Sequence, residues 1–156
     1  MAIPQYVARL REHIGHDLLW LPSVSAVVVD DRGDLLLGKR ADDGRWAVIS
    51  GIAERDEQPA AAIVREVLEE TGVRVVPERL AVVRAHTHVY PNGDRCRFLN
   101  MAFRCRPVAG TARVNDDESL EVAWFAADQL PELEEHWQLV IKRALSSETM
   151  TWFATA

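Results

Sequence analysis

Three glutamates stand close together in a segment whose pattern predicts a helix: Glu66, Glu69 and Glu70. Pro59 suits a first helical position and Gly72 suits the left-handed residue just past a helix end, so the helix should lie between them. The spacing of i, i+3 and i+4 gathers the three carboxylates on one helix face. Carboxylate oxygens are the ligands that Mg2+ prefers, so the cluster indicates a divalent cation site, with a solvated acidic face as the alternative.

The acidic face should lie apart from the face that meets the core. The core face is expected to hold residues at helical spacing: Ala60, Ile63, Val64, Val67 and Thr71. Like charges at the spacing of the glutamates destabilise a helix by about 0.2–0.5 kcal/mol per pair, and the helix dipole disfavours anions near the C-terminal end. Arg65 can relieve part of this repulsion, but one guanidinium cannot neutralise three carboxylates. We therefore expect a cation over a helix face that no apolar layer covers.

The glutamates belong to a longer pattern, G-x5-E-x7-R-E-U-x-E-E-x-G-U, in which U is a bulky aliphatic residue. Its positions are filled by Gly51, Glu57, Arg65, Glu66, Val67, Glu69, Glu70, Gly72 and Val73. The stretch resembles the Nudix box, the signature of the Nudix hydrolase (MutT-like) family. The resemblance implies a loop–helix–loop that binds Mg2+ or Mn2+ and hydrolyses a diphosphate linkage in a nucleoside diphosphate derivative. It also implies an α/β/α sandwich around a mixed β-sheet.

The resemblance also implies roles for single residues of the box. The expected metal ligands are three carboxylates and one backbone carbonyl: Glu66, Glu69, Glu70 and Gly51. Arg65 and Glu57 are expected to form an ion pair that orients these ligands rather than to contact the substrate.

The start of the box departs from the pattern that is common in the family. Ile49 and Ser50 stand where members often carry proline and glycine, and Arg55 and Asp56 stand where a Pro-Gly pair is common. Ser50 and Asp56 make the loop less permissive than glycine would. We therefore expect an altered loop geometry and, with it, an altered substrate fit.

A second acidic stretch, residues 115–121, precedes a predicted strand. In the family, the proton of the attacking water is often accepted by a glutamate in the box or on a later loop. Glu118 is our candidate for such a loop residue, and Glu121 is the alternative. A box glutamate, Glu66 or Glu69, is a further alternative, and the whole stretch could instead be a solvated loop.

Phosphate and base contacts are expected from residues outside the box. Arg40 and Arg45 flank the strand that leads into the box and could bind phosphate, while Trp46 or Tyr90 could stack on a base. Trp46 in a strand also fits a core position. Tyr90 and Pro91 lie near the distance beyond the box at which family members carry substrate-linked residues, which favours dinucleotide or ADP-ribose-like substrates.

Three ring-bearing residues alternate along one face of a predicted strand: His86, His88 and Tyr90. This spacing could indicate a metal site. The site of the family is built from carboxylates, however, so we interpret the histidines as structural or substrate-contacting residues.

Composition limits the class of protein. The 156-residue chain suits one domain, with 48% hydrophobic and 27% charged residues. The net charge of -6 argues against binding of a nucleic acid duplex but allows a small anionic substrate if a metal mediates. No apolar run approaches the roughly 20 residues that span a bilayer, so we expect a cytoplasmic protein without a membrane partner.

Cys96 and Cys105 lie too far apart in one predicted strand to pair, which indicates free thiols.

The chain is expected to divide into an N-terminal helical extension, residues 1–21, and a Nudix domain, residues 22–156. The helix of the extension, from 4 to about 15, could act as a lid, form a contact in a homodimer, or simply pack onto the sheet. Strands are predicted over 24–29, 35–40, 46–49, 80–90, 95–107 and 122–126. A short helical segment is predicted within 127–133 and an amphipathic helix over 134–146. The apolar face of the latter should hold Trp137, Val140, Ile141 and Leu145.

The box does not select one substrate. Candidates implied by the family are ADP-ribose, nucleotide sugars, dinucleoside polyphosphates, and oxidised or ordinary nucleoside triphosphates. A competing hypothesis is a nucleotide-binding or sensing domain with weak catalysis or none. Intact Glu66, Glu69 and Glu70 argue against it, because a sensor has no need of the whole ligand set.

Overall fold

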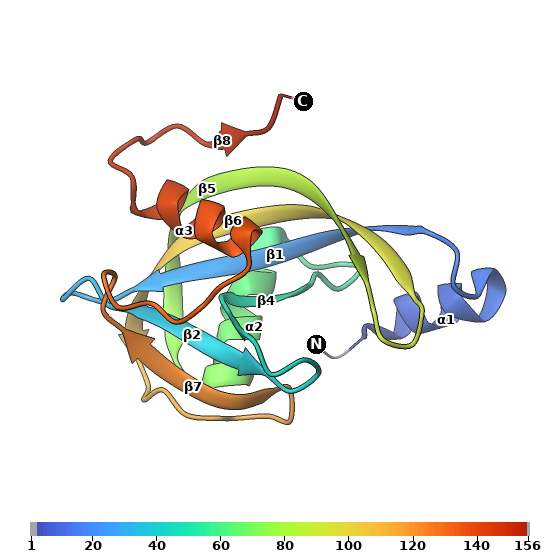
Figure 1. Ribbon diagram of the computed structural model, residues 1–156, viewed down its shortest axis with the longest axis horizontal. Coiled ribbons are helices and arrows are strands. Elements are labelled where there is room, and N and C mark those ends of the chain that lie inside the picture. Colours follow the sequence, from blue (N-terminus) through green and yellow to red (C-terminus); the bar gives the residue numbers. More distant parts are fainter. Residues whose placement is uncertain (1–2, 156) are drawn as a thin grey trace.

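The computed structural model describes residues 3–155. Over this range the chain forms an eight-stranded mixed sheet with helices on both faces, and Figure 1 shows α3 in front of the sheet and α2 behind it. The helices are α1 (Gln5–Ile14), α2 (Pro59–Thr71) and α3 (Glu135–Leu145). The strands are β1 (Leu19–Val29), β2 (Leu35–Arg40), β3 (Trp46–Ala47), β4 (Ile49–Ile52), β5 (Arg74–Val89), β6 (Arg95–Ala109), β7 (Ser119–Phe125) and β8 (Trp152–Phe153). The predicted α/β/α sandwich around a mixed sheet is confirmed.

Strand β1 lies at the centre of the sheet. It pairs antiparallel with β2 and β4 and parallel with β6, and the main strand order is β3-β2-β1-β6-β5-β8. Successive side chains of a strand point to opposite faces. Val24, Ala26 and Val28 therefore pack on the side of α2, while Val27 and Val29 pack on the side of α3. Burial on both faces explains why this strand is a continuous apolar run.

Helix α2 has the bounds that the sequence predicts. Pro59 occupies the first turn, and Gly72 follows the helix with a φ of 71°, a left-handed conformation that favours glycine. Ile63 and Val67 are fully buried against the sheet, as expected. Ala60 was expected on the core face, but it is exposed and Ala62 is buried in its place. The buried stripe is therefore rotated from the one that the spacing suggested.

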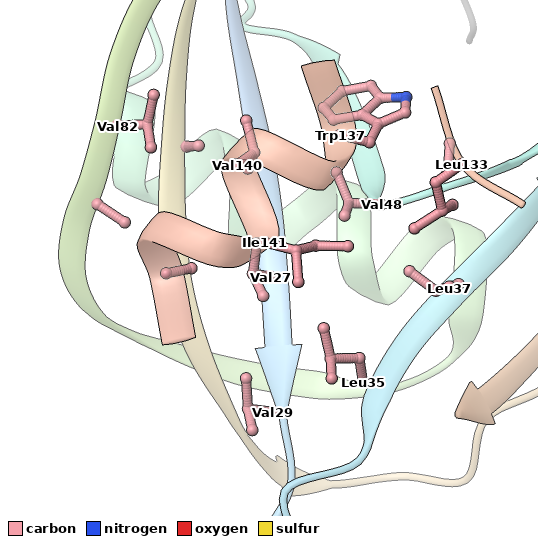
Figure 2. Close-up of a cluster of buried hydrophobic side chains, with 14 residues drawn as sticks. Val27, Val29, Leu35, Leu37, Val48, Val82, Leu133, Trp137, Val140 and Ile141 are labelled. Atoms are coloured by element: carbon pink, nitrogen blue, oxygen red, sulfur yellow. The ribbon is translucent and has the colours of Figure 1, made fainter. Parts of the chain in front are cut away.

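Helix α3 covers the other face through a second apolar cluster. Figure 2 shows Trp137, Val140 and Ile141 of α3 facing Val27 and Leu35 of the sheet. Leu145 was expected on this apolar face, but it is 37% exposed at the end of the helix. Ala144, which is fully buried, fills that position instead.

Several predicted element bounds differ from those in the structure. Strand β1 begins at Leu19 rather than 24, because its first residues pair with β6. The single strand predicted over 46–49 is two strands, since β3 pairs with β2 and β4 pairs with β1. Residues 127–133 form a turn without the predicted helical segment. Strand β8, which pairs with β5, was not predicted.

Two more strands begin earlier than predicted: β5 at Arg74 rather than 80, and β7 at Ser119 rather than 122. Other local predictions agree with the structure. The N-terminal helix is present as α1, and β5 and β6 form the predicted hairpin around the turn at 91–94. Cys96 and Cys105 are both buried free thiols. Within residues 3–155 the helices are too short or too polar to span a membrane.

The C-terminal end of α3 depends on two arginines of the sheet. The Nη2 of Arg79 donates to the carbonyl oxygens of Arg143, Ala144 and Ser146 at 3.0–3.1 Å, and Arg104 also donates to that of Ala144. The last carbonyls of a helix have no partner within the helix, so these side chains satisfy them. The contacts anchor α3 to the β5–β6 hairpin.

Replacing Arg79 with alanine should therefore lower the free energy of unfolding by about 1–3 kcal/mol, because half-buried carbonyls lose a charged donor. Thermal unfolding should show a melting temperature lower by about 2–4 °C for each kcal/mol. Arg74→Ala, at an exposed position of the same strand, is the matched control and should have little effect. Equal shifts in the two variants would contradict the anchoring role of Arg79.

Candidate active site

Two of the three box glutamates on α2 lie in its buried stripe. Glu66 is 7% exposed and Glu70 is 8% exposed, whereas the side chain of Glu69 is 56% exposed and points outward. The expectation of a helix face without an apolar cover is therefore wrong for Glu66 and Glu70, while Glu69 stays close to Glu66 because both carboxylates accept from the Nη1 of Arg65. Helix α2 is rotated so that Glu66 and Glu70 flank Ile63 and Val67 beneath the sheet, while Glu69 remains outside.

The burial of Glu66 depends on the glycine that begins the box. Gly51 lies in β4 and pairs with Val24 of β1. A Cβ atom added to Gly51 would lie 2.0 Å from the carboxyl carbon of Glu66, so any side chain there would displace the glutamate. The first glycine of the box thus provides the space that its first helical glutamate occupies. The role of the Gly51 carbonyl as a metal ligand stays a prediction.

The buried carboxylates are electrostatically unfavourable in the absence of a cation. Burial, reinforced by the charges of Glu118 and Glu69 and opposed by Arg65, raises the pKa of Glu66 to about 7. Burial also raises the pKa of Glu70 well above its ordinary value, and Glu118, Glu66 and Asp116 add to this effect. The acidic groups that face one another are therefore Glu66, Glu70 and Glu118, with Asp116 nearby. We call these four residues the acidic cluster.

The donor set fits a hard divalent cation. Such an ion would favour the charged form of both buried glutamates, and Mg2+ commonly uses one or two protein carboxylates together with waters and substrate phosphates. Within residues 3–155, no three acidic, histidine or cysteine side chains meet closely enough to complete a metal site without such additional ligands. A site completed by water and phosphate therefore fits better than a closed protein cage.

Arg65 connects the helix to the loop that precedes it, as predicted. Its Nε and Nη2 donate to the two carboxylate oxygens of Glu57 at 3.0 and 2.8 Å. Its Nη1 donates to Glu66 and to Glu69, at 3.0 Å each. Glu70 has no ion pair with any residue of the described range. Glu69 could act as a ligand only if its side chain left Arg65, so its role stays a prediction.

Glu118 reaches the acidic cluster because its segment is attached to the end of α2. The side-chain amide of Asn115 donates to the carbonyl oxygens of Leu68 and Glu69 at 3.1 and 3.0 Å. Its backbone N–H donates to the carbonyl oxygen of Glu70 at 3.2 Å. The last carbonyls of a helix need such donors. Asn115 and Asp116 were not predicted as site residues; the only signal in the sequence was the unpaired helix end that required a partner.

Glu121, the alternative to Glu118, lies elsewhere. It is on β7 opposite Lys39, and the Lys39 Nζ lies 2.8 Å from its carboxylate. Its side chain is 57% exposed. The charge of Glu118 acts on both Glu66 and Glu70, whereas Glu121 is committed to Lys39. The geometry favours Glu118.

A cavity of about 250 Å3 lies beside the acidic cluster, and we call it the aromatic cavity. All four predicted substrate contacts line it: Arg40, Arg45, Trp46 and Tyr90. The other rings of its wall are His86, His88, Phe98, His136 and Trp137. A second cavity, of about 450 Å3, is lined by Glu70 and Glu118. Arg40 and Ser50 border both cavities, so they lie between the acidic cluster and the rings.

The two arginines of the aromatic cavity are already paired with acids. Arg40 forms ion pairs with Asp42 and with Asp43, and its Nε lies 3.8 Å from the latter. The Nη1 of Arg45 lies 2.6 Å from Glu134 of the segment before α3. An incoming phosphate would therefore have to compete with these carboxylates for either guanidinium.

The histidines form an uncharged ring surface. His86 stacks on His136 of α3 with ring centres 5.2 Å apart, and His88 meets Tyr90 edge to face at 4.4 Å. Burial, with the charges of His136 and Arg84, lowers the pKa of His86 to about 4, and burial also lowers the pKa of His136. Both imidazoles are thus neutral at pH 7, which suits contact with a flat ring. His136 was not predicted, because it comes from a distant helix.

Trp46 occupies both of the settings that the sequence left open, a core position and a place in a substrate cavity. It packs edge to face on Phe125 at 4.9 Å, against the cluster on the α3 side of the sheet, and it also lines the aromatic cavity.

Fold and site together define a mixed α/β domain in which an acidic cluster adjoins a ring-lined cavity. The NUDIX domain model matches residues 19–145, and the chain belongs to this family.

The chain is similar to curated proteins of this family. It is 41% identical over 110 residues to a MutT-like protein from Streptomyces ambofaciens, an alignment that covers 70% of this chain and 66% of that protein. It is 32% identical over 134 residues to an 8-oxo-dGDP phosphatase from Homo sapiens, covering 82% of this chain and 37% of that protein. The chain thus spans just under two thirds of the first relative and much less of the second.

Solved structures share the fold. An ADP-ribose pyrophosphatase from Streptococcus suis has a TM-score of 0.66 at 22% identity, covering 86% of this chain and 98% of that one. A MutT NUDIX hydrolase from Burkholderia pseudomallei has a TM-score of 0.63 at 26% identity, covering 80% and 98%.

The raised pKa values predict how pH affects the metal-free protein. Because the folded state holds protons on Glu66 and Glu70 more tightly than the unfolded state, the free energy of unfolding should fall as the pH rises from about 5 to 8. Glu70→Gln removes one of these groups. The variant should therefore be more stable than the wild type at pH 8 without metal, and the difference should shrink toward pH 5.

Millimolar Mg2+ or Mn2+ should reverse this order, since a cation that binds only the folded wild type stabilises it by mass action. Melting temperatures of both proteins at pH 5 and 8, with and without metal, provide the measurement. Glu121→Gln is the matched control, because its carboxylate is exposed and paired with Lys39. A Glu70→Gln protein that is less stable than the wild type at pH 8 without metal would contradict this account of the site.

Proposed function

We propose that the protein is a Mg2+- or Mn2+-dependent hydrolase that cleaves a diphosphate linkage in a nucleoside diphosphate derivative. The observation that carries the proposal is the acidic cluster of Glu66, Glu70 and Glu118, which adjoins the aromatic cavity across Arg40 and Ser50. A metal-binding end for phosphates and a ring-lined end for a base match the two halves of a nucleotide.

Glu66 and Glu70 would hold the metal, with the Gly51 carbonyl and Glu69 as further candidate ligands. When bound, the ion would neutralise phosphate charge and orient the attacking water. Glu57 and Arg65 keep Glu66 in place through paired hydrogen bonds, so their contribution is to the geometry of the ligand.

The chain itself supplies the remaining requirements of the reaction. Glu118 would accept the proton of the attacking water, because its carboxylate faces both buried glutamates from a separate segment. Arg40 borders both cavities and would bind a phosphate oxygen after it leaves Asp42 and Asp43.

The base of the substrate is assigned to the aromatic cavity. Trp46, Tyr90 and the neutral pair of His86 and His136 present ring faces that can stack on a heterocycle. Relatives whose names state an 8-oxo-dGDP or an ADP-ribose activity support nucleoside diphosphate derivatives as the substrate class. Within that class, Tyr90 in the wall favours ADP-ribose-like compounds or dinucleotides.

A hydrolysis screen tests the proposal. The panel should contain ADP-ribose, a UDP-sugar, a dinucleoside polyphosphate, 8-oxo-dGDP and 8-oxo-dGTP, each with Mg2+, with Mn2+ and with a chelator. We expect metal-dependent turnover of at least one compound and a loss of several orders of magnitude in Glu70→Gln. Binding of nucleotides without turnover on the whole panel would instead support a sensing domain, and unchanged turnover in Glu70→Gln would contradict the metal site.

The assignment of the proton acceptor gives a sharper prediction. Glu118→Gln should lower kcat by about 10^2- to 10^4-fold, the usual contribution of a positioned general base, while metal affinity stays nearly constant. Glu121→Gln should have a much smaller effect, because that side chain is exposed and bound to Lys39. Measured kcat values and metal affinities decide between them. Equal small losses would return the role to a box glutamate, Glu66 or Glu69.

A further inference from the structure

Helix α1 contacts two segments that border the aromatic cavity. Figure 1 shows it beside the tip of the β5–β6 hairpin, at the end of the molecule away from α3. It also reaches the loop that follows β4, the first part of the box. Nothing in the proposed chemistry uses these contacts.

Arg11 makes the contact with the hairpin. Its Nη2 donates to the carbonyl oxygen of Arg95 at 2.8 Å and to the Sγ of Cys96 at 3.1 Å, and its Nε lies 3.7 Å from Asp94. Its Nη1 donates to the carbonyl oxygens of Gly15 and Asp17 at 3.0 and 2.6 Å. The side chain is only 13% exposed. One guanidinium therefore joins the end of α1 to the first residues of β6, and His16 adds a second link through its Nδ1, which lies 2.8 Å from Asp94.

Tyr6 makes the contact with the box loop. Its hydroxyl donates to the carbonyl oxygen of Ala53 at 3.2 Å, and the guanidinium of Arg55 lies over its ring at 5.8 Å. Ala53 comes shortly after Gly51, whose close approach to Glu66 fixes the ligand. Helix α1 thus spans from the box to the hairpin. We call Tyr6 and Arg11 the N-terminal clasp.

Tyr90 connects the clasp to the aromatic cavity. It packs with Val7 of α1, Leu21, Ile52 and Cys96 in an apolar cluster. It also lines both the aromatic cavity and a separate cavity of about 280 Å3 beneath α1. The backbone N–H of Tyr90 donates to the carbonyl oxygen of Asp94, in the turn that Arg11 contacts. The position of the Tyr90 ring in the cavity wall therefore depends both on α1 and on the turn of the β5–β6 hairpin.

The clasp is also needed for α1 itself. The helix has ten residues, and its N-cap, Pro4, supplies no side-chain hydrogen bond. A helix of this length is marginal in water without tertiary contacts. Losing Arg11 would therefore loosen both α1 and the hairpin tip, which would keep the contact of His16 with Asp94 and the pairing of Leu19 with Cys96. The elements that carry Glu66, Glu70 and Glu118 would remain in place.

We propose that the N-terminal clasp is a substrate-positioning device in which Arg11 fixes Tyr90 in the wall of the aromatic cavity. It sets the affinity for the base-bearing part of a nucleotide and leaves the chemical step unaffected. Its kinetic consequence rests on the function proposed above, but its effects on the hairpin and on ligand binding do not.

The test compares Arg11→Ala with Arg9→Ala, an exposed arginine of the same helix. Hydrogen exchange of the 90–96 segment should become at least about tenfold faster in Arg11→Ala, because the turn loses its anchor, and should be unchanged in Arg9→Ala. The Kd for ADP with Mg2+, measured by the fluorescence of the tryptophans in the cavity wall, should rise about 5- to 30-fold. KM should rise in parallel while kcat stays within about twofold of the wild-type value. This pattern is expected when a contact that binds the substrate equally in the ground state and the transition state is lost.

A double-mutant cycle shows whether Arg11 acts through Tyr90. In a Tyr90→Ala background, Arg11→Ala should add little to the loss of ADP affinity, because the ring that it positions is absent. Tyr6→Phe, which removes only one hydroxyl, should shift Kd and KM in the same direction by less, and it keeps the test valid if Arg11→Ala folds poorly.

Unchanged hydrogen exchange of the hairpin in both Arg11→Ala and Tyr6→Phe would overturn the proposal, as would fully additive effects of Arg11→Ala and Tyr90→Ala. A lower melting temperature with unaltered ADP affinity would also overturn it, because α1 would then be merely structural. If the wild type hydrolyses none of the panel but the exchange and affinity effects appear, the clasp stands and the proposed hydrolase function fails.

Discussion

The burial of two carboxylates between α2 and the sheet is the constraint on which the rest of the structure depends. Isolated charged groups are disfavoured in an apolar environment, and Arg65 bonds to Glu66 but not to Glu70. The arrangement exists because β4 brings Gly51 against α2. In addition, Ile63 and Val67 hold the helix against the sheet. Rotation of α2 by one residue would place either Val67 and Thr71 or Arg65 and Glu69 where Glu66 and Glu70 now lie, and the buried pair of carboxylates would be lost.

Contacts at the C-terminal end of α2 hold the helix in this position. Gly72 ends α2 in a left-handed turn, and Asn115 then binds the freed carbonyls, which brings Glu118 toward the same helix. A single helix end thus fixes both the ligands and the candidate base. Burial raises the pKa of both glutamates, so their charged forms are unfavourable without a cation. A conflict of this kind between local energetics and fold is expected at functional sites.

Local chemistry explains which features the sequence could predict. Pro59 and Gly72 specify the bounds of α2 through backbone preferences alone, and the pairing of Glu57 with Arg65 follows from the box. The outward position of Glu69 could not be derived, because spacing places three carboxylates on one side of a helix but only the approach of β4 decides which of them are buried. The split of 46–49 into two strands and the contribution of His136 were inaccessible for a similar reason, since β4 pairs with the more distant β1 and His136 comes from α3.

The acidic cluster and the aromatic cavity are built from different parts of the molecule. The cluster uses β4, α2 and the segment that binds the end of α2, whereas the cavity wall comes mainly from β3, the β5–β6 hairpin and α3. The hairpin is also where α1, which lies outside the matched family region, attaches. Substitutions of the rings in the wall therefore need not disturb Glu66 or Glu70, because these rings come from elements other than α2. Under the proposed function, this arrangement would let one set of metal ligands serve substrates that differ in the group bound by the rings, and it would locate selectivity where the box pattern carries no information.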